Sequence, residues 1–468
     1  MYAKTLSVYD FRCFGTAKLQ LQHPGRRTKG ASEINNVNLV LGDNGGGKSS
    51  VLRAVAIATL APILLETGFV AYRMVRRPGV KEALLKVEAI LDGTESGHGN
   101  VRSRKRTSTE MLARFEARER SSRDRLHLEK TPDTPIADLI YDDYSPAFFV
   151  VGYGATRRVE TSDFTESSAR RQRGLRYQRV AGLFEDHVAL RPLQAWFPRL
   201  RDEHRPQAIE IINAVLPDNV RFGGRYDDDD EQYLFEFDGR ETPFTALSDG
   251  YKAFVGMAGD LVGHLADVCP AKAALTDISG IVLIDEIDLH LHPAWQRTIL
   301  PSLASAFPKL QFICTTHSPL VASTVRKENV FITSDADDGT ATVKQIEESV
   351  FGRSAEQLLL SSYFGLETTR SDEFVTETES LLQDAAAGNK EAALAFLDML
   401  AAPLNALEDQ VATATDRNSR KSGSGDSELA HGMDPDEAPA AEKRSAVGDV
   451  PASDTAATDH SERARSQE

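Results

Sequence analysis

Residues 42–49, Gly-Asp-Asn-Gly-Gly-Gly-Lys-Ser, have the types and the spacing needed to bind phosphate groups. They fit the pattern G-x-x-x-x-G-K-[ST], in which backbone N–H groups of a glycine-rich loop surround phosphate oxygens. Lys48 can reach the β- and γ-phosphates of a nucleotide, and the hydroxyl of Ser49 can ligate Mg²⁺. A glycine-rich hairpin, the simpler interpretation, does not explain a Lys-Ser pair after three glycines. The residues expected to contact ATP and Mg²⁺ in this loop are Gly42, Asn44, Gly45, Gly46, Gly47, Lys48, Ser49 and Ser50.

A pair of carboxylates, Asp285 and Glu286, follows the apolar run GIVLI at 280–284. At the carboxyl end of a buried strand, Asp285 can hold Mg²⁺ through water, and Glu286 can orient and deprotonate an attacking water. Two adjacent acidic residues alone are a weak signal. Together with the phosphate-binding loop they predict hydrolysis of ATP.

Three more polar residues, Asp288, His290 and His292, lie close to this pair in the sequence. Carboxylate and imidazole ligands together could bind a transition metal at a separate site. We favour the nucleotide site, because its Mg²⁺ already accounts for the acidic pair.

The elements that must position these residues are visible as apolar runs without polar alternation, which are typical of parallel strands buried on both faces. Such runs lie at 38–41, 146–152, 280–284 and 310–314. A helix should begin at Lys48 and point the positive end of its dipole at bound phosphates. The sequence also predicts a β-hairpin within 5–21, a helix after a capping Ser354, and helices over 371–412. This order of elements predicts an α/β fold.

Composition narrows the class of protein. The chain has 468 residues, a formal net charge of −16 and three widely spaced cysteines, Cys13, Cys269 and Cys314, without a CxxC pair. Neither a disulfide framework nor a zinc cluster is expected, and a reducing cytoplasm is the predicted compartment. The first residues do not resemble a signal peptide. The longest apolar stretch, 51–65, is interrupted by Arg53 and is shorter than the roughly 20 residues of a membrane span, so no membrane partner is expected.

Charge is distributed unevenly along the chain. Residues 413–468 hold 12 acidic and 7 basic residues and almost no large apolar side chain, which predicts a disordered acidic tail. Two basic segments stand out: 101–130 has ten Lys or Arg against five Asp or Glu, and 157–179 has seven against three. Each segment is either a solvated insertion of mixed charge or a surface that contacts nucleic-acid phosphates. The acidic run 227–231 is most simply a solvated turn.

Two further motifs reveal a resemblance. Leu247-Ser248-Asp249-Gly250-Tyr251 precedes a helix-compatible stretch, and Thr315-Thr316-His317-Ser318-Pro319 follows the run at 310–314. With these motifs the chain resembles the ABC-type ATPase heads of the RecF, Rad50 and SMC class. The phosphate-binding loop matches the family form GxNGxGKS, and residues 10–14, DFRCF, look like the family's NFRxF-type first strand.

The resemblance implies roles for single residues. LSDGY looks like the family's signature motif, whose Ser248 and Gly250 would contact the γ-phosphate of ATP bound to a second copy. His317 matches the switch histidine that senses the γ-phosphate, which makes it a catalytic residue beside Lys48 and Glu286. Asp288 falls where the family's D-loop aspartate begins its contacts between subunits.

Within the class, the run DEIDLHLHPAWQ at 285–296 resembles predicted ATPases of bacterial defence systems, namely Septu-type, retron-associated and OLD-like ATPases. It lacks the DEPTSALD-like continuation of transporter subunits. Residues 152–157, GYGATR, also look like a motif of that group and would lie near the Q-loop position. Arg157 could therefore sense nucleotide or nucleic acid, or it could be a surface arginine; the sequence leaves both open.

The resemblance implies a P-loop NTPase with an ABC-type head: a mixed, mostly parallel sheet flanked by helices, an N-terminal antiparallel β region, a helical insertion and a helical C-terminal appendage. The predicted domains are a head at 1–335, a β-hairpin with helical appendage at 336–412, and the tail at 413–468. Within the head, an inserted segment is expected at about 66–140 and a helical signature lobe at about 160–275.

The implied function is ATP-gated head-to-tail dimerisation that regulates an effector, such as a nuclease in anti-phage defence or DNA processing. No acidic cluster after His317 resembles the nuclease domain of OLD proteins, so the nuclease is expected to be another chain. A repair or chromosome-organising ATPase without a nuclease is the main alternative. A transporter subunit and a binding module with degenerate ATPase chemistry are weaker ones.

Overall fold

The computed structural model describes residues 1–26, 34–91, 107–128, 136–159, 174–336 and 338–399. The chain forms two compact units, Met1–Arg370 and Ser371–Glu468. The predicted tail, and residues 101–106, 129–130 and 160–173 of the two basic segments, lie outside the described residues.

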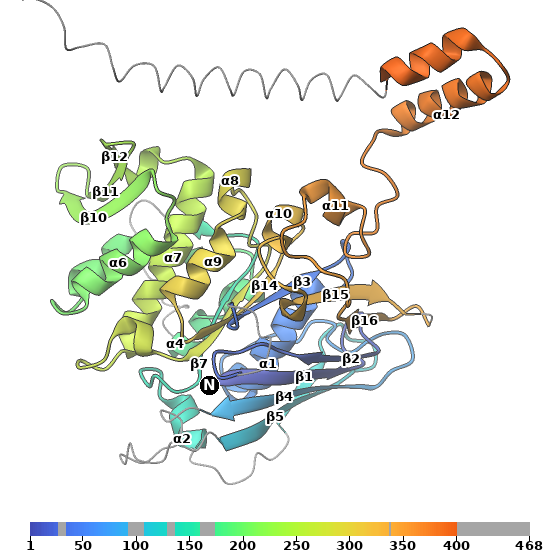
Figure 1. Cartoon of the computed structure of the whole chain (residues 1–468). Coiled ribbons are helices and arrows are strands. Elements are labelled where there is room, and N and C mark those ends of the chain that lie inside the picture. The colour runs from blue at the N-terminus through green and yellow to red at the C-terminus, as the bar shows by residue number, and fades with distance from the viewer. Residues whose placement is uncertain (27–33, 92–106, 129–135, 160–173, 337, 400–468) are drawn as a thin grey trace, which may run out of the picture. The chain divides into compact units, whose positions relative to one another are not determined.

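The main sheet of the first unit has six strands in the order β16-β15-β3-β14-β13-β7 (Figure 1). Neighbouring strands are parallel except for β16, which pairs antiparallel with β15 at one edge. Their bounds are Val37–Leu41 (β3), Phe149–Tyr153 (β7), Gly280–Ile284 (β13), Leu310–Thr315 (β14), Val330–Asp335 (β15) and Ala341–Lys344 (β16). The prediction of a mixed, mostly parallel sheet built from the continuous apolar runs is confirmed.

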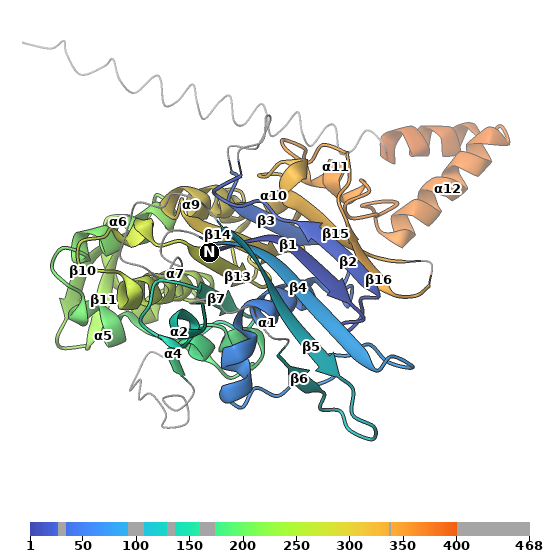
Figure 2. The same cartoon turned by 90° about the horizontal axis from the view of Figure 1, so that it is seen from below.

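A second sheet is antiparallel throughout and has the order β2-β1-β4-β5-β6 (Figure 2). Its strands are Tyr2–Tyr9 (β1), Thr16–Gln20 (β2), Glu82–Leu91 (β4), Thr107–Glu116 (β5) and Arg125–His127 (β6). The predicted hairpin and N-terminal antiparallel region are confirmed. Residues 66–140, expected as an inserted segment, supply three strands of this sheet: β4, β5 and β6. Every second residue of β4 is buried, from Ala83 to Leu91, and this period of two favours a strand over a helix.

Helix α1, Lys48–Glu66, packs between the two sheets and touches strands of both. Its side chains are buried nearly all round, as expected for a helix covered on both sides. Among the described residues, α1 is the one helix long and apolar enough to cross a membrane, and 72% of its most apolar window is buried inside the protein. The stretch that breaks at Arg53 is thus a core helix.

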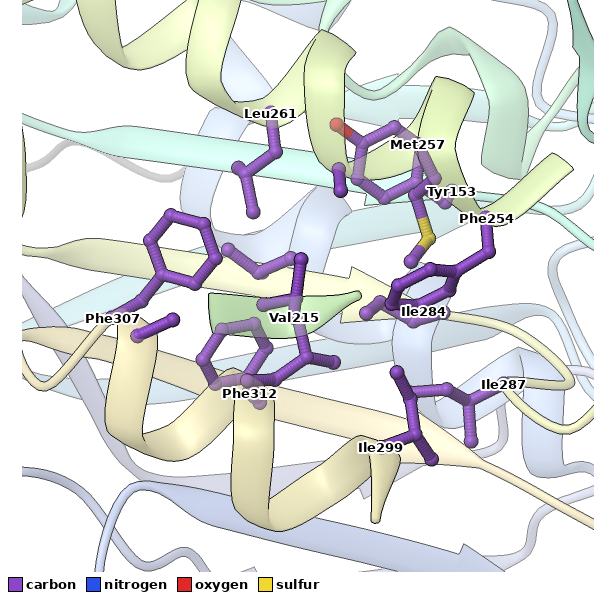
Figure 3. Close-up of a cluster of buried hydrophobic side chains, with 14 of the residues drawn as sticks. Tyr153, Val215, Phe254, Met257, Leu261, Ile284, Ile287, Ile299, Phe307 and Phe312 are labelled. Carbon is purple, nitrogen blue, oxygen red and sulfur yellow. The ribbon is translucent and has the colours of Figure 1, made fainter. Parts of the chain in front are cut away.

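The opposite face of the main sheet is covered by a helical lobe whose apolar side chains meet the strands (Figure 3). Phe254 and Leu261 of one helix, Phe307 after another, and Ile284 and Phe312 of the sheet belong to this cluster. The longer elements are α6 (Arg205–Val215), α7 (Asp249–Val268) and α9 (Ile299–Ala306), with a small sheet of β10 (Val220–Asp227), β11 (Gln232–Phe237) and β12 (Arg240–Pro243). The acidic run forms the exposed β10–β11 turn, as predicted.

Short elements complete the first unit. They are α2 (Ile136–Tyr141), β8 (Arg158–Val159), α4 (Gly174–Gln178), η2 (Ala181–Leu183), β9 (Ala189–Leu190), α5 (Leu193–Trp196), η3 (Phe197–Arg199), η4 (Phe244–Ala246), η5 (Leu275–Asp277), α8 (Pro293–Gln296), α10 (Pro319–Ala322), η6 (Lys327–Asn329) and α11 (Ala355–Leu359). Ser354 caps α11 as predicted, because its hydroxyl accepts the N–H of Gln357 at 3.2 Å.

The described part of the second unit is helical, as predicted for the C-terminal region. It contains α12, Asp372–Ala386, and a helix over 390–399. The Ser371 hydroxyl caps α12 by accepting the N–H of Phe374 at 3.3 Å. Thr378 donates to the sulfur of Met399 at 3.3 Å, which links the two helices.

Candidate nucleotide-binding site

The phosphate-binding loop runs from the end of β3 to the start of α1, and two of its glycines are required by close contacts. Gly42 has φ +138°, and a Cβ placed on it would lie 2.1 Å from Oγ1 of Thr333 in β15. Gly47 has φ +97°, and its Cβ would lie 2.6 Å from the sulfur of Cys13. The loop is therefore pressed against β15 of the main sheet and against the β1–β2 turn of the second sheet, and larger residues at 42 or 47 would displace it.

Lys48 lies at the first turn of α1 with its ammonium group folded back over the loop. The Nζ donates to the carbonyl oxygens of Gly42 and Asp43, both at 2.8 Å. Burial lowers the pKa of Lys48, although the carboxylates of Asp285 and Glu286 oppose this shift. A phosphate group would give this buried cation a stronger acceptor than a backbone carbonyl.

The two carboxylates follow β13 as predicted, and Thr315 at the end of β14 connects them. The Thr315 hydroxyl donates to Oδ1 of Asp285 at 2.6 Å and accepts the backbone N–H of Glu286 at 2.7 Å. Glu286 has φ +49°, in the left-handed region, so the chain turns sharply directly after the buried Asp285. One hydroxyl thus sets the positions of both acidic residues.

These segments meet around a hollow of about 220 Å³. Its walls combine the phosphate-binding loop, the first turns of α1, the carboxylate pair and the predicted switch histidine. The lining residues are Arg12, Asn44, Gly45, Gly47, Lys48, Ser49, Ser50, Arg53, Asp285, Glu286 and His317. The hydroxyl of Ser49 and the carboxylate of Asp285 are oxygen ligands of the kind that Mg²⁺ prefers, so the residues present fit a nucleotide with its Mg²⁺.

The loop that carries His317 is held from both sides by the segment after the carboxylates. The hydroxyl of Thr316 donates to Asp288 Oδ1 at 2.5 Å, and the hydroxyl of Ser318 donates to Gln296 Oε1 at 2.6 Å. Gln296 in turn donates to the carbonyl of Leu291 at 2.9 Å. These bonds fix the two neighbours of His317 and leave its side chain at the hollow.

Arg157 lies beside the site but not in the hollow. Its guanidinium group donates to the carbonyl oxygens of Asp285, at 2.7 Å, and of Glu286. Burial lowers the pKa of Arg157, and the nearby carboxylates of Asp288 and Asp285 oppose this shift. The side chain is therefore bound to the turn that carries the carboxylate pair, unlike a free surface arginine.

Two arginines that line the hollow, Arg12 and Arg53, were not predicted as site residues. Arg12 has φ +55° in the turn after β1, and Arg53 lies one turn along α1 from Ser49. Their signals were present in the sequence: Arg12 within DFRCF, and Arg53 as a lone charge in an apolar run.

The signature residues lie outside the hollow. Ser248 precedes α7 as its N-cap, and Gly250 lies in the first turn. Gly250 packs against the loop after the carboxylates, since a Cβ on it would lie 2.2 Å from the carbonyl oxygen of His290. Neither Ser248 nor Gly250 is among the described residues that line the hollow of its own chain.

The alternative transition-metal site has other contacts at its residues. Asp288 accepts the hydroxyl of Thr316, and Nδ1 of His292 accepts the N–H of Ala294 at 3.3 Å at the start of α8. Among the described residues, no group of three or more His, Cys, Asp or Glu side chains is arranged to hold a metal ion.

A buried ionic cluster joins α7 to the strand beside the site. Asp260 of α7 accepts the hydroxyl of Tyr153, at the end of β7, at 3.0 Å and the backbone N–H of Arg191 at 3.0 Å. His264 lies one turn further, 3.3 Å from the same carboxylate, and Arg191 also pairs with Asp267 at 2.9 Å. Since the backbone N–H of Asp285 donates to the Tyr153 carbonyl, the cluster connects α7 to the carboxylate pair.

Comparison with known proteins identifies the domain. A family model described as "AAA domain, putative AbiEii toxin, Type IV TA system" matches residues 37–323. The chain belongs to this family. The match runs from β3 through the carboxylate pair to the end of α10 and includes every predicted site residue. The domain is accordingly an AAA ATPase domain.

Relatives of this AAA domain occur in defence systems. The chain is 30% identical over 227 residues to the Septu protein PtuA of Bacillus mycoides (strain KBAB4), covering 48% of this chain and 30% of the relative. It is 44% identical over 99 residues to the Retron Vc95 probable ATPase of Vibrio cholerae serotype O1 biovar El Tor, covering 21% of this chain and 19% of the relative. The chain thus spans less than a third of either relative. The predicted kinship with defence-associated ATPases is confirmed.

Among solved structures, the chain is similar to an SMC head bound to the C-winged helix domain of ScpA, with 15% identity and a TM-score of 0.43 over 74% of this chain and 98% of that one. This score is low, and the fold assignment rests on the sheets and helices of the chain itself.

Proposed function

We propose that the chain hydrolyses ATP in a site that a second copy completes. The observation that carries this proposal is the division of the predicted site. Lys48, Glu286 and His317 line one hollow, whereas Ser248 and Gly250 lie outside it at the start of α7. In a head-to-tail pair, each ATP would lie between the phosphate-binding loop of one copy and the LSDGY segment of the other. The two copies would then be held together by contacts that both make with ATP.

The chemistry follows from positioning and charge. Lys48 would leave the carbonyls of Gly42 and Asp43 and bind the β- and γ-phosphates. Ser49 and Asp285 would hold Mg²⁺, which supplies charge stabilisation at the phosphates when bound. Glu286 would accept the proton of the attacking water, and His317 would contact the γ-phosphate. Thr315 holds Asp285 and Glu286 in their relative positions.

We infer that opening and closing of the pair regulates a separate effector. Kinship with a Septu protein and a retron ATPase favours a role in anti-phage defence, in the cytoplasm, with a nuclease as the effector. The described residues after His317 fold into the β15–β16 hairpin and helices. Contact with nucleic acid through the basic segments 101–130 and 157–179 would connect the ATPase cycle to its trigger. A repair or chromosome-organising ATPase without a nuclease remains the alternative.

The proposal is tested by Glu286→Gln, which removes the base but keeps the shape of the side chain. We expect this variant to bind ATP without turnover and to accumulate as a dimer, so that its mass by light scattering doubles when ATP is added. Glu210→Gln, an exposed carboxylate on α6, is the matched control and should behave as the wild type. A Glu286→Gln variant that stays monomeric in ATP contradicts the shared site.

The loop assignment is tested by Lys48→Ala, which should abolish nucleotide binding measured by a fluorescent ATP analogue. Lys272→Ala removes an exposed lysine and serves as the control. Unchanged ATP affinity in Lys48→Ala would overturn the assignment. A pulldown with and without ATP then separates the two alternatives, since only the first predicts a nuclease among the bound chains.

A further inference from the structure

Two loops at one end of the antiparallel sheet concentrate positive charge. Residues 71–82 lead into β4, and residues 116–125 connect β5 to β6. The loops adjoin because Glu82 pairs with Glu116 in the β4–β5 register. We call them the arginine loops. Their cationic residues are Arg73, Arg76, Arg77, Lys81, Arg118, Arg120, Arg123 and Arg125.

One buried carboxylate holds the arginine loops together. The side chain of Asp124 is fully buried, and it accepts the backbone N–H groups of Met74 at 2.6 Å and Val75 at 2.9 Å. It also pairs with Arg77 at 2.5 Å, and the N–H of Arg73 donates to the carbonyl of Ser122 at 2.9 Å. The fold thus fixes two like-charged segments side by side, against their mutual repulsion.

Most of this charge is left exposed. Arg77 pairs with Asp124, and Arg76 pairs with Asp10 at 2.8 Å. The other six cations of the loops make no ion pair with any residue that the structure describes, and all six are exposed. They are Arg73, Lys81, Arg118, Arg120, Arg123 and Arg125. A chain with a net charge of −16 therefore presents a local surface of positive charge.

An aromatic ring lies among these cations. Tyr72 is 56% exposed, and it forms an isolated antiparallel bridge with Arg123 of the other loop. The guanidinium carbon of Arg73 lies 5.9 Å from the centre of the Tyr72 ring. An exposed ring beside a guanidinium group can stack on an unpaired base while the arginines bind the adjacent phosphates.

We propose that the arginine loops bind a single strand of nucleic acid, with phosphates on Arg73 and Arg123 and a base on Tyr72. This deepens the nucleic-acid contact of the proposed function and rests on it, while adding residues 71–82, which lie outside both basic segments. A single strand would use both features at once, with a base stacked on Tyr72 and phosphates on the arginines, whereas ion pairs with an acidic protein surface would use the arginines alone. The ring therefore favours nucleic acid.

The test is a titration of a fluorescein-labelled oligothymidine of about 30 nucleotides with the full chain, followed by anisotropy. The variant Arg73→Ala/Arg123→Ala should bind at least about tenfold more weakly, and its slope of log affinity against log salt should be smaller by about 1.4, since each phosphate contact to a single strand contributes about 0.7. Arg221→Ala/Arg240→Ala removes two exposed arginines of the β10–β12 sheet and should bind as the wild type. Equal losses in both variants would overturn the proposal.

The ring is tested separately. Tyr72→Ala should weaken binding about tenfold with an unchanged salt slope, and Tyr72→Phe should bind as the wild type. Full affinity in Tyr72→Ala, or displacement of the strand by oligoglutamate at equal charge, would overturn the proposal in favour of an acidic protein. Oligouridine of the same length distinguishes RNA from DNA as the strand.

The arginine variants should keep the ATPase rate of the wild type, because the arginines lie outside the nucleotide hollow. Failure of strand binding in an active ATPase would therefore count against the arginine loops alone. If the wild type itself showed no ATPase activity, that result would instead count against the proposed function.

Discussion

Gly250 lies against the carbonyl of His290 so closely that a Cβ on Gly250 would stand 2.2 Å from that oxygen. The first turn of α7 thus packs against the loop that follows the carboxylate pair of its own chain. A change in that loop on ATP binding would move the start of α7, which the proposed function places against the ATP of a second copy. The contact gives a physical reason for glycine at this position beside any contact with nucleotide.

Gly250→Ala should therefore push α7 away from His290 and lower the ATPase rate at least about tenfold, because a shift of the helix start misplaces the completing residues. Nucleotide binding to the free chain should persist, since Lys48 is untouched. Gly223→Ala is the control, because its Cβ would meet no atom within 4 Å. Steady-state ATPase rates and a thermal melt of both variants check this, and an active Gly250→Ala would contradict the close contact.

Thr315→Val should lower kcat by about 10- to 100-fold with a small change in KM. Valine keeps the shape of the side chain but removes the donor to Asp285 and the acceptor for the N–H of Glu286, and two lost hydrogen bonds in a buried site correspond to about 1–3 kcal/mol. Thr315→Ser should restore most of the rate because it keeps the hydroxyl. Thr342→Val, at an exposed hydroxyl on β16, is the control. A fully active Thr315→Val would show that the carboxylates hold their positions without it.

Gln296→Ala should lower kcat about tenfold while KM changes little. The substitution removes the acceptor for Ser318 and the donor to Leu291, so the loop of His317 loses one of its two supports. Gln296→Glu keeps the acceptor alone and should show an intermediate rate. The control is Gln345→Ala, which removes an exposed amide bonded to the carbonyl of Glu328. If KM rather than kcat changes, Gln296 acts on binding and not on the position of His317.

The buried cluster on α7 should make the protein sensitive to acid. Burial and the charge of Arg191 lower the pKa of His264. Burial alone would raise the pKa of Asp260, but His264 and Arg191 outweigh it and hold that pKa well below its usual range. Both groups bind protons more weakly in the folded chain than in the unfolded chain, so protonation favours unfolding.

The free energy of unfolding should accordingly fall as pH drops below about 6.5, the ordinary pKa of histidine, and fall further below about 4, where unfolded Asp takes up a proton. His264→Gln should remove the first part of this loss, whereas His187→Gln, at an exposed histidine, should leave it intact. Asp260→Asn should destabilise the chain at neutral pH by about 3–5 kcal/mol, because it leaves Arg191 with an incomplete set of partners. Urea unfolding at several pH values measures both effects.

The nucleotide loop and the carboxylate pair could be predicted because each is a short segment whose pattern carries its own chemistry. A strand, a glycine turn and a helix start are local events, and residues 42–49 specify all three. The same holds for Ser354, whose cap depends on residues within one turn.

The supports of the site could not be predicted in this way. The contacts of Thr315 with Asp285 and of Gln296 with Ser318 depend on the pairing of β13 with β14. The sequence of either segment alone does not predict its partner. Arg12 reaches the hollow because its backbone adopts a left-handed conformation, and the residue types next to it in the sequence do not predict that conformation. The strands between residues 66 and 140 could not be placed from the sequence alone, because β4 joins the sheet by pairing with β1, which lies far away in the sequence.

The order of the main sheet has a consequence for how the chain reaches its folded state. Strand β3, residues 37–41, lies between β14 and β15, which are synthesised only from residue 310 onward. During most of synthesis the phosphate-binding loop therefore lacks the strands that flank β3. The apolar helix α1 meanwhile lacks the main sheet, which covers one of its two sides in the folded protein. Long-range strand pairing of this kind slows folding and leaves apolar surface exposed in the incomplete chain. We expect nascent chains that end before β15 to aggregate or to bind chaperones. Nucleotide binding should appear only after β15 has been synthesised, in one cooperative step.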